Sequence, residues 1–268
     1  MNQIFSKKNR VLLAELVRTE FKLRYQGSAL GFLWSLLKPL LMFTILYIVF
    51  GKLLKIGSDI EHYAVYLLLG IVLWNFFVEA TSQGLSATVA RGDLIRKINF
   101  PKYIIVVSGT ISALINLGIN LVVIGVFMAI NHVDLLITAP LVLLPIILLY
   151  ILSLAIAFFL AAANVKFRDV GHIWEIIIQA AFYATPILYP ISLVLAIDKN
   201  IGSLLMLNPV AQAIQDARYL LITHQTTTTS QIFNEWYIVA IPYVLTAFII
   251  VLATLYFRKS SKNFAENV

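Results

Sequence analysis

The sequence predicts an all-α integral membrane protein, and the distribution of charge and the composition carry that prediction. Four long stretches, 103–131, 135–165, 176–197 and 236–257, contain no Asp, Glu, Lys, Arg or His. The 268 residues are 60% hydrophobic and 12% charged, about half the charged share of a soluble domain. Each stretch is long enough to cross about 30 Å of hydrocarbon. Open sheet edges are not viable in lipid and the alternating pattern of barrel strands is absent, so we expect helices.

Six apolar segments are expected to cross the membrane, which places both ends of the chain on one side. The first contains Lys38 and Pro39. A span beginning after Pro39 would leave only about a dozen apolar residues before Lys52, too few to cross, so Lys38 is expected inside the span. The predicted spans are 31–51, 62–82, 103–131, 135–161, 173–194 and 236–257.

Basic residues set the expected orientation, because cytoplasmic loops of membrane proteins are enriched in Lys and Arg. Of the 20 Lys and Arg residues, only Lys52, Lys55, Lys199 and Arg218 fall opposite the termini. Both termini are therefore expected in the cytoplasm. We attribute the net charge of +7 to these basic cytoplasmic loops, and not to a surface that binds nucleic acid.

An amphipathic helix is expected over 9–25, before the first span. Apolar and charged residues recur there at helical spacing, so they fall on separate faces. A helix of this kind lies along a membrane interface. The apolar face carries Leu12, Leu16 and Leu23, and the charged face carries Glu15, Arg18 and Lys22.

Two further segments carry helix signals without being spans. In the charged stretch 92–102, Asp93 is a candidate N-cap and Pro101 a candidate stop for a brief helix. The segment 204–222 is too apolar for a solvated loop, yet Asn208, Pro209 and Arg218 argue against a full span. Two interpretations stay open: a broken helix pair dipping into the outer leaflet, or an amphipathic surface helix.

Several classes of active site are excluded by the residues present. The absence of cysteine rules out thiolate metal sites and thiol nucleophiles. The four histidines stand singly, and neither a phosphate-binding loop nor a serine nucleophile elbow occurs. We therefore expect no enzyme, no metal and no cofactor in this chain. An ion-coupled carrier is disfavoured as well, because ionisable residues within the spans are few.

Polar side chains form ridges on three of the predicted spans. Their four-residue spacing stacks each set along one helix face. Two interpretations stay open: hydrogen bonds between helices, or the lining of a path for a hydroxyl-rich ligand. The ridges comprise Asn75, Glu79 and Gln83; Ser108, Ser112, Asn116 and Asn120; and Glu175, Gln179 and Tyr183.

Aromatic residues near these ridges, together with Lys38, complete the candidates for such a path. Aromatic rings offer a stacking surface, and many others in the chain are expected in interface belts. Lys38 either snorkels to the cytoplasmic headgroups or faces a cavity and meets an anion. The path candidates are Trp34, Lys38, Trp74, Asn75, Phe76, Phe77, Ser112, Asn116, Asn120, Gln179, Tyr183 and Tyr189.

An ordered set of short segments runs through the whole chain. They are FKLRY (21–25), GSALGFLW (27–34), KP (38–39), LIRK (94–97), FP (100–101), NVKFRDV (164–170), TPILYP (185–190) and NP (208–209). With these segments in this order, the chain resembles the ABC-2 type permease family, specifically the exporters of bacterial surface polysaccharides such as O-antigen, capsule and teichoic acid.

The resemblance implies a homodimer in the bacterial plasma (inner) membrane, with six helices from each protomer around a central channel. It implies two copies of a separate ATPase, which bind ATP and Mg²⁺, and a glycan on an undecaprenyl-type lipid as substrate. The segment 92–102 would be the coupling helix, flanked by 9–25, and 204–222 the outer gate. The implied ATPase-docking residues are Arg91, Asp93, Arg96, Lys97, Phe100, Lys102, Glu15, Arg18 and Lys22, and the implied gate residues are Asn208, Pro209 and Arg218.

Other functions stay open at this point. An ABC-2 exporter of a drug or small amphiphile predicts an apolar pocket facing lipid instead of a continuous polar path. A membrane-embedded glycosyl- or acyltransferase needs clustered acids or a histidine base, which the sequence does not offer. A non-catalytic scaffold or channel component would not respond to ATP.

Overall fold

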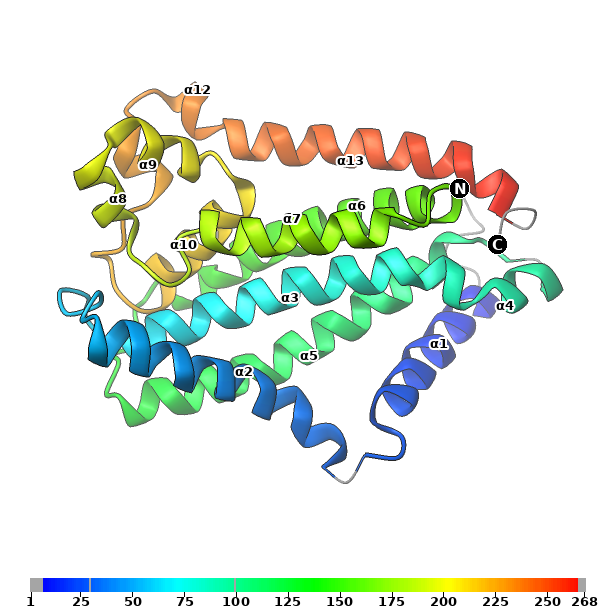
Figure 1. Ribbon diagram of the computed structural model, residues 1–268, viewed down its shortest axis with the longest axis horizontal. Coiled ribbons are helices and arrows are strands. Elements are labelled where there is room, and N and C mark those ends of the chain that lie inside the picture. Colours follow the sequence, from blue (N-terminus) through cyan, green and yellow to red (C-terminus); the bar gives the residue numbers. More distant parts are fainter. Residues whose placement is uncertain (1–6, 29, 99, 265–268) are drawn as a thin grey trace.

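The computed structural model describes residues 7–28, 30–98 and 100–264. Over these residues the chain forms helices and no β-strand, which confirms the predicted all-α class. Figure 1 shows long helices running along the longest axis. Short helices gather at one end, and α1 (Lys7–Tyr25) and α4 (Gly92–Lys97) lie at the other, where α13 (Ile241–Ser260) finishes.

Among the residues that the structure describes, five helical stretches are long and apolar enough to cross a membrane. They lie over the first four predicted spans and the sixth. They are Trp34–Leu53, made of α2 (Trp34–Leu46) and the π-helical η2 (Tyr47–Leu53); α3 (Tyr63–Ala90); α5 (Tyr103–Ile130); Ala139–Lys166, made of η3 (Ala139–Val142) and α6 (Leu143–Lys166); and Trp236–Asn263, made of α12 (Trp236–Val239), α13 and η4 (Ser261–Asn263).

The fifth apolar segment differs from the continuous helix expected over 173–194. Helix α7 (Val170–Ala184) has 15 residues, about 22 Å at 1.5 Å per residue, which is short for a span. Thr185 is extended because the following Pro186 disfavours helical geometry before it and lacks an N–H. The short α8 (Ile191–Ile197) begins only after Pro190.

Helix α3 is the central element and packs along α5 on one side and α6 on the other. Most of its side chains are buried, as expected for a helix with neighbours on several sides. At Gly84 the backbones of α3 and α6 approach so closely that a Cβ would overlap Ala157. Small residues permit this kind of close contact between membrane helices.

The segment 204–222 forms parts of two helices that meet at Asn208. Helix α9 (Lys199–Met206) ends before it, and α10 (Pro209–Leu221) begins after it with Pro209 at the first helical position. The Asn208 Oδ1 accepts from the Val210 N–H at 3.0 Å and so caps α10. Helix α10 packs against α6 and α3, with most of its side chains buried, and α11 (Thr229–Ile232) follows it.

The charged segment 92–102 forms a helix that is shorter than expected. Helix α4 begins after Arg91, so the prediction of Asp93 as N-cap is wrong; Asp93 lies in the first turn. The helix ends at Lys97, well before Pro101, because Ile98 is extended. Ile95 and Phe100 are buried and hold the segment against the bundle, while Asn99 lies outside the described residues.

Candidate functional site

A cleft of about 490 Å³ opens between α2, α3 and α5. We call it the polar cleft. It brings together residues from the first span and from two of the predicted ridges, which lie far apart in the sequence. The path candidates that line it are Trp34, Lys38, Asn75, Phe76, Asn116 and Asn120, and Ser35, Glu79 and Ser82 join them.

A chain of side-chain amides surrounds the Glu79 carboxylate in the polar cleft. Asn116 Nδ2 donates to Glu79 Oε2 at 2.7 Å, and Gln83 Nε2 donates to Oε1 at 2.9 Å. Asn120 Nδ2 donates to the Asn116 carbonyl at 2.9 Å and to the Ser35 carbonyl at 3.4 Å. The polar ridges of α3 and α5 therefore hydrogen-bond to each other and also line a cavity. The two interpretations, hydrogen bonds between helices and the lining of a path, are thus compatible at this place.

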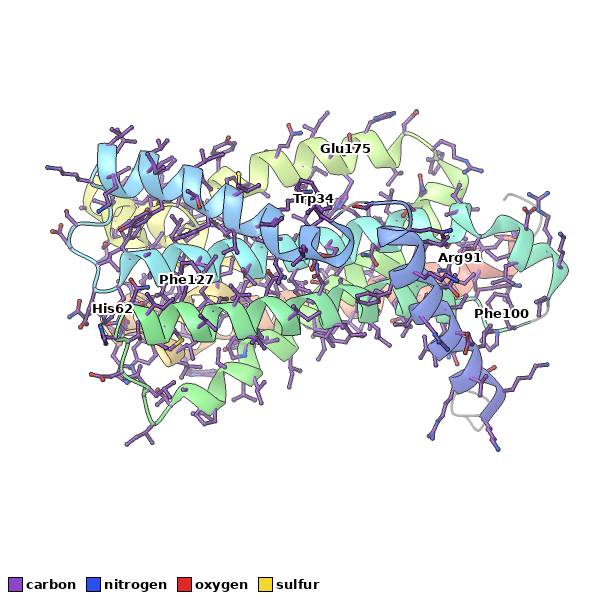
Figure 2. All side chains as sticks on the ribbon, turned by 90° about the horizontal axis from the view of Figure 1, so that it is seen from below. Trp34, His62, Arg91, Phe100, Phe127 and Glu175 are labelled. Atoms are coloured by element: carbon purple, nitrogen blue, oxygen red, sulfur yellow. The ribbon has the colours of Figure 1, made fainter. Side chains whose placement is uncertain are left out.

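The rim of the polar cleft comes from α2. Trp34 and Lys38 are one turn apart, so they share a helix face. Trp34 remains 47% exposed and Lys38 is exposed, whereas Pro39 is buried. Figure 2 looks onto this side of the molecule, with Trp34 at the start of α2. An aromatic ring and a cation thus stand at the opening of a cleft whose interior offers amides and a carboxylate.

Two of the predicted aromatic path residues pack between helices instead. Trp74 and Phe77 are buried, with ring centroids 5.6 Å apart. Trp74 lies 5.9 Å from Phe182, and Phe77 lies 6.3 Å from Trp174. These rings hold α7 against α3, away from the polar cleft.

The predicted path residues on and after α7 lie elsewhere as well. Gln179 and Tyr183 are exposed on α7, with Tyr183 69% exposed. Tyr189 donates from its hydroxyl to the Tyr183 carbonyl at 2.8 Å and so bridges the break after α7. The structure therefore divides these path candidates among the polar cleft, the packing between α3 and α7, and the exposed face of α7 with the break after it.

Ser112 lies apart from the other path candidates, in a cluster around Glu20 of α1. Ser112 Oγ donates to Glu20 Oε2 at 2.8 Å, and Ser108 Oγ donates to Oε1 at 3.1 Å. Arg91 NH2 forms an ion pair with Oε1 at 2.7 Å, and Figure 2 shows Arg91 beside α1. Glu20 is absent from the predicted site residues, and the sequence offered no signal for it, since the hydroxyls of Ser108 and Ser112 also donate to backbone carbonyls of their own helix.

The predicted ATPase-docking residues divide into outward and inward sets. Phe100 is buried, and Lys102 donates to the Ile95 carbonyl at 3.2 Å with its ammonium 4.9 Å from the Phe100 ring. Burial lowers the pKa of Lys102. Arg91 turns toward Glu20. The outward set consists of Asp93, Arg96 and Lys97 on α4 and Glu15, Arg18 and Lys22 on α1, all exposed.

Arg218, predicted as a gate residue, is fully buried on α10. Its Nε donates to the Tyr66 carbonyl at 3.0 Å, and its two terminal nitrogens donate to the carbonyls of Pro186 and Ile187 at 2.7 and 2.8 Å. One terminal nitrogen also donates to Gln215 Oε1 at 2.9 Å. The guanidinium lies 3.6 Å from the centre of the Tyr66 ring, a cation–π contact. Arg218 thus ties α10 to α3 and to the chain break after α7.

No metal centre accompanies these clusters in the described part of the chain, where His, Asp and Glu do not gather in groups of three or more. The clusters described above offer hydrogen-bonding groups, charges and aromatic rings.

Comparison with known proteins shows the family to which this chain belongs. The model of the ABC-2 type transporter family matches residues 11–222. The chain is similar to the O-antigen export system permease protein RfbA of Myxococcus xanthus, at 33% identity over 220 residues, which cover 81% of this chain and 82% of that protein. A protein of the same name from Klebsiella pneumoniae is 26% identical over 259 residues, covering 95% and 94%, and another is 27% identical over 213 residues, covering 78% and 79%. The predicted class, a transporter subunit and not an enzyme, is confirmed, and this chain belongs to the ABC-2 type transporter family.

Proposed function

We propose that this chain is the transmembrane subunit of an ATP-driven exporter of lipid-linked surface polysaccharide. The names of its relatives support this substrate class, since each is an O-antigen export permease. The observation that carries the proposal is the polar cleft, where Trp34 and Lys38 stand over side-chain amides and Glu79. Rings stack on sugar faces, amides hydrogen-bond to hydroxyls, and a lysine ammonium attracts phosphate.

The topology we propose has six crossings with both termini in the cytoplasm of a bacterial plasma (inner) membrane. The fifth crossing in chain order combines α7, the extended 185–190 segment and α8, which together span more length than α7 alone. Polar backbone groups at the break are satisfied by Arg218, as membrane-embedded irregular segments require. Helices α9 and α10 then form the outer gate, and α1 lies along the cytoplasmic interface.

We propose a homodimer whose two α7 helices face a common path. Glu175, Gln179 and Tyr183 share one exposed face of α7. A carboxylate and an amide are costly against lipid and favour a watery passage. Two ATPase copies, which bind ATP and Mg²⁺, would dock on the exposed charges of α4 and α1 and transmit a rigid-body displacement.

Lys38 provides the test of the polar cleft. In a strain deleted for this gene, Lys38→Ala should restore surface glycan about tenfold less well than the wild-type chain, since the lost pairing with phosphate is worth about 1–2 kcal/mol. Lipid-linked glycan should accumulate on the cytoplasmic face. The ATPase should still co-purify with the variant, because Lys38 lines the polar cleft and is not among the exposed charges of α1 and α4 that are proposed to dock it.

Lys52→Ala is the matched control, since Lys52 is an exposed lysine at the end of the same span and does not line the cleft. Equal export by wild type and Lys38→Ala would remove Lys38 from the mechanism. Unchanged surface glycan in the deletion strain would refute the proposed substrate. If the ATPase still co-purifies, an ABC-2 exporter of small amphiphiles remains the candidate, and if no ATPase is recovered, a scaffold or channel component remains.

A further inference from the structure

A second cleft, of about 630 Å³, lies between α6, α10, α11 and α13, near the end of the bundle opposite the termini. It shares no residue with the polar cleft and none with the exposed face of α7. We call it the α6–α10 cleft. The proposed export path leaves it without a role.

One wall of the α6–α10 cleft is an apolar stripe on α6. Leu144, Ile147, Leu148 and Ile151 recur at helical spacing and so share one face. Leu144 and Ile147 are more than half exposed in the folded chain. In a membrane, such a stripe presents a surface that fits an acyl chain.

The other wall is polar and acidic. The Asp216 carboxylate on α10 lines the cleft together with Tyr219, Tyr243 and the hydroxyls of Thr228 and Ser230. No Lys or Arg lines it. The cleft is thus apolar along α6 and negatively charged along α10.

Asp216 is not neutralised by the arginine near it in sequence. Residues two apart on a helix point about 200° apart, so Asp216 and Arg218 leave α10 on opposite sides. Arg218 donates to the carbonyls of Tyr66, Pro186 and Ile187 and to Gln215. Over the part of the chain that the structure describes, Asp216 forms no ion pair. The carboxylate therefore remains available to a cation that enters the cleft.

We propose that the α6–α10 cleft binds a membrane phospholipid with an ammonium headgroup, such as phosphatidylethanolamine. The ammonium pairs with Asp216, and one acyl chain lies along the α6 stripe. A carboxylate without a nearby cation selects against anionic headgroups. The leaflet follows from the proposed topology, which places this end of the bundle outside; the pairing of headgroup and carboxylate does not depend on it.

The test uses the full-length chain in nanodiscs made of equal parts phosphatidylethanolamine and phosphatidylglycerol, followed by native mass spectrometry of the lipids that stay bound. The wild-type chain should retain phosphatidylethanolamine in preference to phosphatidylglycerol. Asp216→Asn should reduce that preference about tenfold, the difference between a charge-assisted and a neutral hydrogen bond. Asp134→Asn, an exposed carboxylate at the same end but outside the cleft, should leave it unchanged.

A second variant keeps Asp216 intact. Ile147→Trp places a bulky ring at an exposed position of the stripe, so the chain should fold and lose bound lipid of both kinds. Equal retention of the two lipids by wild type, or an undiminished preference in Asp216→Asn, would overturn the proposal. The lipid measurement requires no export, so a chain that binds phosphatidylethanolamine but fails to export glycan would refute only the proposed function.

Discussion

Two arginines at opposite ends of the bundle are stabilised in different ways. Arg91, beside α1, pairs with the Glu20 carboxylate, and both side chains keep some exposure, 17% and 19%. Arg218, on α10, is fully buried and donates only to neutral oxygens. Water can replace either partner of the first pair at small cost, whereas the second arginine leaves several buried carbonyls without a donor if it moves.

The difference separates a contact that can open from one that holds the fold. The Arg91–Glu20 pair joins α1 to the end of α3, next to α4, where an ATPase is proposed to dock. Arg218 joins α3, α10 and the break after α7. We therefore expect motion at the end that carries α1 and rigidity around Arg218.

The largest expected effect comes from Arg218→Leu. The change leaves the carbonyls of Tyr66, Pro186 and Ile187 buried without their donor, and should lower the free energy of unfolding by about 3 kcal/mol. Thermal unfolding of the purified chain in detergent measures it. Arg258→Leu, an exposed arginine at the other end, serves as control. A loss below about 1 kcal/mol would mean that water or other donors satisfy these carbonyls and that this end is not rigid.

A smaller loss is expected from Gly70→Ala on α3. A Cβ there would overlap the Arg218 guanidinium, whose position its hydrogen bonds fix. Overpacking of this kind costs about 2 kcal/mol. Gly125→Ala on α5 is the matched control, since nothing lies within 4 Å of its Cβ. If both variants unfold at the same temperature, Arg218 adjusts easily and the contrast with Arg91 disappears.

The smallest effect on stability is expected from Glu20→Gln. The pair with Arg91 is partly exposed, so its loss should cost about 1 kcal/mol. Hydrogen exchange should quicken in α1 while α3 stays protected, because only the local contact opens. Glu61→Gln, an exposed carboxylate at the opposite end, should change neither helix. Unchanged protection of α1 would show that Leu16 and its apolar neighbours hold the helix without the ion pair.

Much of the helical arrangement follows from charge-free runs, because hydrocarbon demands long apolar helices whatever the tertiary contacts. The break in the helix after α7 was harder to predict from the sequence. The run 176–197 has no charge and reads as one span, and only Pro186 and Pro190 signal the interruption.

The placement of side chains could be predicted where a ridge faced a cavity and not where tertiary packing decided it. Asn116 and Asn120 line the polar cleft as expected for a path, yet Trp74 and Phe77, equally aromatic, fill the contact between α3 and α7. Lys102 turns inward because the chain bends back at Phe100, which composition does not reveal. Glu20 gains its partners from α3 and α5, far away in sequence.

The close approach of α3 and α6 at Gly84 has a mechanical consequence. Backbones in direct contact leave no room for one helix to slide or tilt against the other, since any shift brings Ala157 into the α3 backbone. Helices α3 and α6 must therefore translate and rotate as one body. In a transport cycle, the movements that remain possible are therefore displacements of the peripheral helices α1, α2 and α7 relative to this body.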